Sequence, residues 1–199
     1  CEINSVTDNP VIFSADDAVS GGNFHGQPIA LPMDYAGLAA SELGNISDRR
    51  SYLLLEGKIE LPIYLIKNSG VNSGLMIAQY CSAALASENK SLCFPASADS
   101  IPTSLGQEDH VSMGSISGRK TLRIIDNLEK ILSVEMLCAA QAIDFRRPNK
   151  SSIILETCLE EVRKQIPHIE EDLEVHQLIN QSLKLIQSGK LLELTSNLD

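Results

Sequence analysis

The chain has 199 residues, of which 43% are hydrophobic and 21% charged, and its formal net charge is −10. This balance is enough to bury a core, so it excludes a disordered protein, and an acidic chain without a basic stripe argues against nucleic acid or an anionic membrane as partner. Aromatic residues make up only 4% and Trp is absent, whereas small residues are plentiful. Small side chains permit close helix packing, so we expect an all-α fold.

Five cysteines lie scattered through the chain without a Cys-x-x-Cys pair, and their odd number leaves one over. This pattern favours reduced thiols in a cytoplasmic protein over a disulfide framework or a zinc site. No stretch approaches the ~20 apolar residues that span a bilayer. The N-terminus also lacks the features of a signal peptide, and we interpret Cys1 as an internal residue of a longer protein.

Residues 1–28 are rich in turn signals, namely Asp8-Asn9-Pro10 and the glycine-rich segment 20–26, and should form loops. The Gly21-Gly22 pair lets backbone approach a ligand or another chain closely, but the glycine spacing does not fit a dinucleotide fingerprint. Phe24 within this segment either fills a local apolar gap or forms the wall of a pocket.

Two helices are expected next. Apolar residues at three- and four-residue steps predict a helix from residue 28 to about 56, with Pro32 near its start. After a break at 70–73, Asn72 or Ser73 is a candidate N-cap for an Ala- and Ser-rich helix that ends near Lys90 and should be buried on several sides. The apolar positions of the first helix are Leu31, Tyr35, Leu38, Ala39, Leu43 and Ile46.

Residues 91–107 predict a long irregular connection, a kind of segment that is usually functional or disordered. One very long helix should follow from 111 to 145, ended by Arg146-Arg147-Pro148. Two amphipathic helices are expected at 152–165 and 171–188, with Gly189 as a C-cap. We treat residues 1–150 as a helical core that bears active-site loops and 151–199 as a C-terminal helical segment of the same domain.

Two carboxylates and an imidazole, Glu108, Asp109 and His110, stand just before the long helix. Acids at a helix N-terminus are stabilised by its free N–H groups and dipole, so capping explains the cluster without any function. Alternatively, one acid faces a pocket and there pairs with a cationic substrate or moves a proton. The local residue pattern leaves both interpretations open.

Taken together, the loops resemble the aromatic amino-acid ammonia-lyase family, and its histidine-specific branch most closely. The resemblance runs in order through the whole chain and corresponds to roughly the C-terminal two-fifths of such an enzyme. The matching segments are 2–10 (EINSVTDNP), 20–28 (SGGNFHGQP), 72–74 (NSG), 87–90 (SENK), 99–104 (DSIPTS) and 107–113 (QEDHVSM).

The resemblance implies a bundle of long antiparallel helices of the L-aspartase/fumarase type, in cytoplasmic homotetramers that convert L-histidine to urocanate and ammonia. It also implies an electrophile, 4-methylideneimidazol-5-one, made from an Ala-Ser-Gly tripeptide, and no metal. This chain contains no Ala-Ser-Gly. By the resemblance, the electrophile, the catalytic tyrosines and a carboxylate-binding arginine belong to the N-terminal part of the protein, so the chain alone should be inactive.

Three site residues carry over from the family. Asn9 matches a catalytic asparagine near the electrophile and the substrate carboxylate, Phe24 a substrate-binding phenylalanine contributed by a neighbouring subunit, and Glu108 a catalytic glutamate that meets the substrate imidazole. A buried carboxylate opposite a phenyl ring would lose hydration without compensation, whereas an imidazole offers it a charge-assisted hydrogen bond. Because phenylalanine and tyrosine lyases usually have glutamine there, Glu108 favours histidine.

The other histidines and the Arg49-Arg50 pair receive structural interpretations. We expect structural hydrogen bonds for His25 and His110, solvated positions for His168 and His176, and salt bridges between helices for Arg49-Arg50. Two alternative functions remain: a tyrosine or phenylalanine ammonia-lyase or aminomutase, and a non-catalytic helical assembly module.

Overall fold

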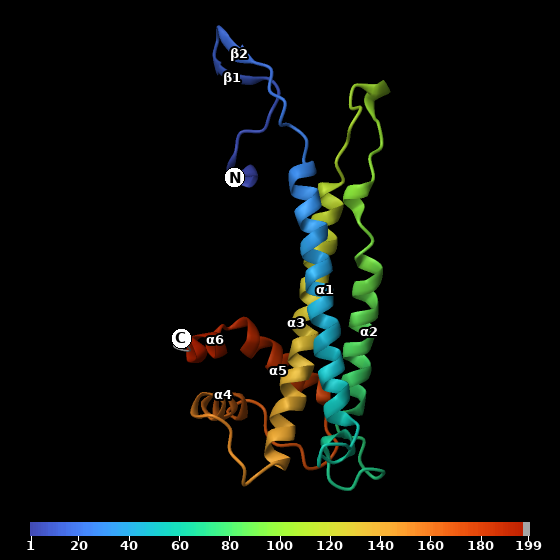
Figure 1. Cartoon of the computed structure of the whole chain (residues 1–199), viewed down its shortest axis with the longest axis vertical. Coiled ribbons are helices and arrows are strands. Elements are labelled where there is room, and N and C mark those ends of the chain that lie inside the picture. Colours follow the sequence, from blue (N-terminus) through green and yellow to red (C-terminus); the bar gives the residue numbers. More distant parts are fainter. Residues whose placement is uncertain (197–199) are drawn as a thin grey trace. The chain divides into compact units, whose positions relative to one another are not determined.

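The computed structural model describes residues 1–196, and within that range the secondary structure is mainly helical (Figure 1). The predicted all-α class is confirmed, apart from one hairpin of short strands. The helices are α1 (Gln27–Leu55), α2 (Met76–Leu92), α3 (Gly114–Phe145), α4 (Ile153–Arg163), α5 (Val175–Gln187) and α6 (Lys190–Thr195), and the strands are β1 (Val11–Ser14) and β2 (Asp17–Val19). No helix in this described range is long and apolar enough to cross a membrane.

The chain forms two compact units, each built from two stretches of sequence. Unit 1 comprises residues 1–40 and 90–125, and unit 2 comprises residues 41–89 together with the chain from residue 126 onward. Helices α1 and α3 each contribute to both units. The division into a core and a C-terminal segment at residue 150 concerns a different boundary and stays a prediction.

Helix α1 turns its small and polar residues inward. In unit 1, a Cβ added to Gly37 would lie 3.1 Å from Ile124 Cδ1, and in unit 2 one added to Gly44 would lie 3.3 Å from Ile131 Cδ1, so glycine allows α3 to approach closely. The predicted helix is confirmed, but the apolar side chains from which it was predicted are exposed. The exposed fractions are 54% for Leu31, 75% for Tyr35, 49% for Leu38, 45% for Leu43 and 45% for Ile46.

Helix α2 runs antiparallel to α1 in unit 2, since Asp48 on α1 contacts Ser82 on α2 while Gly44 lies near Asn89. Ser82 Oγ donates to Asp48 Oδ1 at 2.5 Å. Burial of α2 on several sides was wrong, because a single face is buried and the opposite side chains are exposed. That buried face consists of Ala78, Ser82, Ala86 and Asn89.

The predicted N-cap of α2 is also wrong, because the helix begins at Met76 rather than directly after Asn72 or Ser73. The backbone N–H groups of Ser73 and Gly74 instead donate to the carboxylate of Asp172 at 2.8–3.0 Å. Asn72 Oδ1 accepts from the Asp172 backbone N–H at 3.2 Å. These polar residues therefore fasten the C-terminal segment to unit 2.

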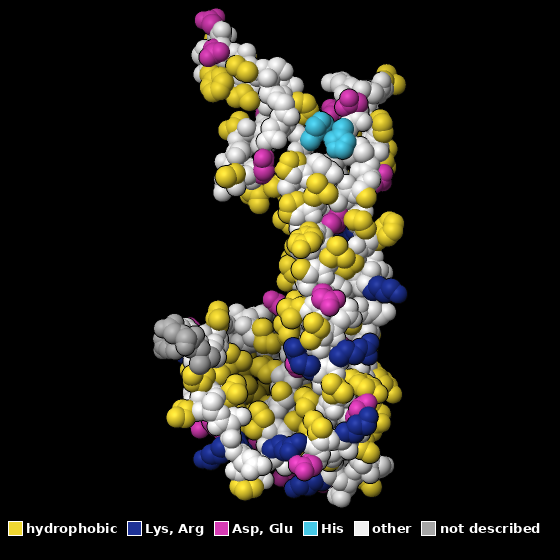
Figure 2. All heavy atoms as spheres, viewed as in Figure 1, with side chains coloured by type: hydrophobic (Ala, Val, Ile, Leu, Met, Phe, Trp, Pro, Cys, Tyr) yellow, Lys and Arg dark blue, Asp and Glu magenta, His cyan; other side chains and the backbone are white. Residues whose placement is uncertain are grey.

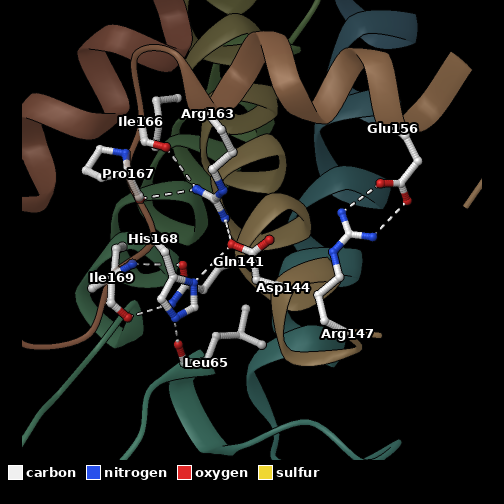
Figure 3. Close-up of polar contacts among 10 residues, drawn as sticks. All are labelled: Leu65, Gln141, Asp144, Arg147, Glu156, Arg163, Ile166, Pro167, His168 and Ile169. Carbon is white, nitrogen blue, oxygen red and sulfur yellow. Dashed lines mark hydrogen bonds and ion pairs between the residues drawn. The ribbon is translucent and has the colours of Figure 1, made fainter. Parts of the chain in front are cut away.

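The core of unit 2 lies where α1, α2 and α3 meet the C-terminal helices. Gln141 on α3 is fully buried and holds the segment before α5, because its Nε2 donates to Leu65 O and Ile169 O and its Oε1 accepts from Ile169 N–H (Figure 3). The side chains that pack here with less than 2% exposure include Leu65, Ile66, Leu75, Leu137, Ile166 and Ile169.

His168 is half-buried, so the prediction of a solvated position was wrong. Its Nδ1 lies 3.0 Å from Asp144 Oδ2 (Figure 3). Its ring packs edge-on against Phe145, with 5.5 Å between centroids. Arg163 pairs with the same carboxylate at 2.7 Å. His176, by contrast, is exposed, as expected.

The ends of the C-terminal helices follow the sequence signals. Residues 146–148 end α3, and Ser152 caps α4 by accepting from Leu155 N–H at 3.4 Å. Arg147 and a backbone N–H of Ser151 hold the pKa of Glu156 at about 2, well below its usual range. Gly189 follows α5 with a φ of 71°, as expected of a C-cap glycine, but a further short helix, α6, begins directly after it.

The expected salt bridge between helices is confirmed for Arg50, whose guanidinium pairs with both carboxylate oxygens of Glu135 on α3. Within residues 1–196, Arg49 instead pairs with Asp48 of its own helix, at 4.0 Å, so the expected salt bridge between helices is not formed by Arg49. The bridge joins α1 and α3 within unit 2, where the two helices run in the same direction.

Candidate active-site segments of unit 1

Asp34 fixes the start of α1 to the rest of unit 1. Its Oδ2 accepts from Ser97 N–H at 2.7 Å and from Ser117 Oγ at 3.0 Å, and Lys120 Nζ lies 3.9 Å from Oδ1. Burial by itself would raise the pKa of this carboxyl, but hydrogen bonds from Ser97 and Ser117 and the Lys120 charge together lower it. Asp34 therefore ties the helix that follows Phe24 to the helix that follows Glu108.

Asn9 is held between the two turns of the N-terminal segment. Its Oδ1 accepts from Ser20 Oγ and from Gly21 N–H, both at 3.1 Å. A Cβ at Gly21 would lie 3.3 Å from Asp8 O, so the close approach of the two turns favours glycine there. Asn9 is exposed, and its Nδ2 has no hydrogen-bond partner within residues 1–196, so it can donate to a ligand.

The segment between these turns contains the hairpin of β1 and β2, although the sequence predicted only loops. Val11 pairs with Val19 and Ile12 with Ala18. The signal was a run of β-branched and aromatic residues, Val11-Ile12-Phe13, directly after a turn.

Phe24 lies at the end of the glycine-rich segment, just before α1, and is 44% exposed. Its ring centroid is 4.6 Å from that of His25. A side chain that filled a gap within this chain would be buried, so Phe24 does not do so here, and its place in a pocket wall stays a prediction.

Glu108 lies on a tight loop in front of α3. Thr103 N–H donates to Glu108 O at 3.0 Å, Glu108 N–H donates to Thr103 O at 3.3 Å, and between them the chain turns through left-handed residues, including Leu105 at a φ of 58°. The side chain is exposed. Helix α3 begins only at Gly114 and has no acidic residue in its first turn, so the capping interpretation was wrong.

The segment bearing Phe24 and the segment bearing Glu108 lie against each other. The rings of His25 and His110 meet edge to face, with 4.9 Å between centroids and an interplanar angle of 88°. A Cβ at Gly26 would lie 2.8 Å from Ser112 Oγ, so glycine allows the close approach, and a larger residue would require the Ser112 side chain to shift. Figure 2 shows two histidines side by side on the surface, close to acidic side chains.

Structural hydrogen bonds were expected for His25 and His110, but the contact between them is one of rings. Within the described part of the chain, neither imidazole has a hydrogen-bond partner. Sequence reasoning also missed Asp34, which positions both segments. A signal was present there, since Asp34 interrupts an apolar helix with a charge.

The predicted site residues supply an exposed carboxylate, an amide donor and a phenyl ring, all within unit 1, and these are groups that suit a small polar ligand. No group of His, Cys, Asp or Glu within residues 1–196 is placed to hold a metal ion. A cavity of about 430 Å³ in unit 2 is lined by other residues, among them Tyr52, Glu56, Tyr64, Gln79 and Tyr80, and includes none of the predicted site residues.

Comparison with known proteins adds independent evidence. The family model described as aromatic amino acid lyase matches residues 1–164. The chain is 53% identical over 193 residues to a histidine ammonia-lyase of Natranaerobius thermophilus, covering 96% of this chain and 38% of that protein. It is 48% identical to a histidine ammonia-lyase of Sorangium cellulosum, covering 96% of this chain and 39% of that protein.

Solved structures agree with these relatives. The crystal structure of histidine ammonia-lyase from Trypanosoma cruzi superposes with a TM-score of 0.94 at 45% identity, covering 98% of this chain and 39% of that chain. Tyrosine aminomutase from Streptomyces globisporus superposes with a TM-score of 0.91 at 36% identity, covering 98% of this chain and 38% of that chain. The chain thus spans about two-fifths of the length of the proteins it matches.

Proposed function

The chain belongs to the aromatic amino acid lyase family, and on that premise we propose that it is the C-terminal part of a histidine ammonia-lyase. The complete protein would eliminate ammonia from L-histidine to give urocanate. The observation that carries this proposal is an exposed carboxylate, Glu108, on a segment that lies against the one bearing Phe24. Identity also favours histidine, at 53% to one histidine ammonia-lyase against 36% to a tyrosine aminomutase.

Each of the three residues has a proposed role. The Glu108 carboxylate would bind the imidazole of the substrate by a charge-assisted hydrogen bond, which offsets the loss of hydration on closure of the site. Phe24 would form an apolar wall beside that ring. Asn9 would donate from Nδ2 to an oxygen of the substrate carboxylate or of a neighbouring group.

The cofactor implied by the family is 4-methylideneimidazol-5-one, formed from an Ala-Ser-Gly tripeptide that this chain lacks. When present, this group supplies the electrophile for the elimination of ammonia. Asn9 fits a place beside it, because its Oδ1 is occupied by Ser20 and Gly21 while its exposed Nδ2 is free to donate. The chain would therefore complete a site whose electrophile comes from the N-terminal part of the protein, and would be inactive alone.

Two alternatives have specific support. A tyrosine or phenylalanine ammonia-lyase or aminomutase is favoured by the likeness to tyrosine aminomutase, at a TM-score of 0.91. A non-catalytic helical assembly module is favoured by the apolar side chains exposed along α1.

An assay of the complete protein separates these functions. We expect it to form urocanate from L-histidine, detected in the near ultraviolet, with little coumarate from tyrosine or cinnamate from phenylalanine. If coumarate or cinnamate predominates, the substrate is tyrosine or phenylalanine rather than histidine. No product from any of the three amino acids would favour the assembly module.

The proposed partners, besides L-histidine, are further copies of the protein in a homotetramer and its own N-terminal part. The support is the exposed apolar face of α1, which includes Leu31, Tyr35 and Leu38, because burial of each such side chain is worth about 1.5–3 kcal/mol. Nucleic acid and membranes are not proposed as partners. The five free cysteines favour the cytoplasm.

The chain of residues 1–199 should therefore associate in solution. Sedimentation is expected to show species larger than a monomer, and a Tyr35→Glu, Leu38→Glu double variant should shift them towards the monomer, because charges on this face oppose burial. Glu170→Gln, an exposed change outside the apolar face, should leave sedimentation unaltered. A compact, stable monomer of the unmodified chain would contradict this expectation.

A further inference from the structure

We infer that the ring pair of His25 and His110 is a positioning element that sets the spacing between the segments of Phe24 and Glu108 within one chain, and thereby the place at which each side chain meets substrate in the assembled protein, Phe24 in a site shared with a neighbouring subunit. The inference rests on the proposed function of those two residues. His25 directly follows Phe24, and His110 lies on the loop of Glu108. Through their contact, the two segments hold each other in place.

Because the side chains of Phe24 and Glu108 are exposed, the distance between them is set by the backbone segments that carry them. Phe24 is 44% exposed and contacts the His25 ring, while Glu108 is exposed and is held through its backbone by Thr103. No side-chain hydrogen bond within residues 1–196 fixes the Glu108 carboxylate. The positions of Phe24 and Glu108 therefore follow the positions of their segments. Contacts between the two segments are what fix one segment relative to the other.

Besides the Asp34 anchor and the approach of Gly114 to Gly26 and Ala30, the described part of the chain has two contacts between the segments that lie close to Phe24 and Glu108. One is the close approach of Gly26 and Ser112, where a Cβ would lie 2.8 Å from the hydroxyl. The other is the edge-to-face contact of His25 and His110 at 4.9 Å, which continues to Phe24 at 4.6 Å. The rings of Phe24, His25 and His110 thus contact one another in a continuous row, from the expected pocket wall to the carboxylate loop.

The contact uses the shape of the rings rather than their nitrogen atoms. The planes are 88° apart, which is the favoured T-shaped arrangement of aromatic pairs, and neither imidazole has a hydrogen-bond partner within residues 1–196. Another flat ring at position 110 should therefore preserve the spacing, whereas an aliphatic side chain should not. This difference separates a positioning role from proton transfer by the imidazole.

The test is a double-mutant cycle in the complete protein, with kcat and KM measured for L-histidine. His25→Ala and His110→Ala should each raise KM about 3- to 10-fold, the range expected from loss of an aromatic pair, with a smaller change in kcat. The double variant should be no worse than the single ones, because both remove the same contact. His110→Phe should restore most of the affinity, and His110→Leu should not.

Several outcomes would overturn the inference. One is a double variant in which KM rises by the product of the two single-variant increases. Another is a fall in kcat at unchanged KM, and a third is a His110→Phe variant as impaired as His110→Ala, since either would indicate that the imidazole itself takes part in the chemistry. His176→Ala, at an exposed position in unit 2, is the matched control and should not alter KM.

Two further readouts keep the result interpretable. Circular dichroism and sedimentation should show that His110→Phe and His110→Leu fold and assemble alike, so a difference in KM between them reports ring contact rather than stability. If the complete protein prefers tyrosine or phenylalanine, the proposed substrate fails, but the same cycle with that amino acid still tests the ring pair. Equal KM values for the Phe and Leu variants would then refute it.

Discussion

Replacement of Glu108 by glutamine in the complete protein should lower kcat/KM for L-histidine by about 100-fold, because a charge-assisted hydrogen bond worth up to about 3 kcal/mol is lost. Glutamine keeps the size and shape of the side chain, and the hydrogen bonds that hold residue 108 use only its backbone. The loop should therefore keep its conformation. The measurement is the rate of urocanate formation over a range of histidine concentrations.

The control for this variant is Glu170→Gln, which removes an equal charge from an exposed position in unit 2. It should leave kcat/KM within about twofold of the unmodified protein, as expected for surface changes. Near-normal turnover by the Glu108→Gln protein would remove this residue from the site. Unchanged circular dichroism would show that any loss of activity is not a loss of folding.

Replacement of Gln141 by leucine should destabilise the chain by about 3 kcal/mol or more, since each buried polar group left unpaired costs about 1–3 kcal/mol. Gln141 serves three backbone groups: Leu65 O at 3.1 Å, Ile169 O at 2.8 Å and Ile169 N–H at 3.1 Å (Figure 3). Leucine is close to glutamine in volume, so the variant leaves little cavity and tests the hydrogen bonds themselves. The measurement is the free energy of unfolding by urea.

The matched control is Gln177→Leu on α5. That amide is exposed and bonds only to Glu174, so the change should alter the free energy of unfolding by less than about 0.5 kcal/mol. A Gln141→Leu protein with stability close to the control would show that water replaces the amide. It would also mean that other contacts, such as Asp172 with Ser73 and Gly74, suffice to hold the C-terminal segment.

The helices could be predicted because their signals are local. Apolar spacing indicated α1 and α3, the Arg146-Arg147-Pro148 run marked the end of α3, and Gly189 marked the end of α5. The start of α2 could not be predicted in this way. Ser73 is a good capping residue, but its N–H group and that of Gly74 bind Asp172, which lies far along the chain.

The orientation of α1 needed the structure. Its apolar stripe satisfies the helical period, yet Tyr35 is 75% exposed while Asp34 beside it is 8% exposed. Periodicity reports that a helix has two unlike faces, but not which face packs within the chain. Here glycine and serine face α3 and α2 because they allow close approach, and the larger apolar residues are left for other surfaces.

The candidate site, too, could be predicted only in part from the sequence. Asn9, Phe24 and Glu108 could be singled out from sequence motifs, because their chemistry is carried by residue type and by neighbours in the chain. The contacts that join the Phe24 segment to the Glu108 segment could not be predicted. They are made by Asp34 and by the ring pair of His25 and His110, and they link residues that are 63 to 85 positions apart.

The amino-acid order by itself determined the helical class, most of the helix ends and which residue types are available for binding an imidazole, since all of these depend on short-range patterns. Only the tertiary structure decided which helix face is buried, what holds His168 and Gln141, and how the segments of Phe24 and Glu108 meet. Those outcomes arise from packing between distant residues, where a few hydrogen bonds and ring contacts outweigh local preference.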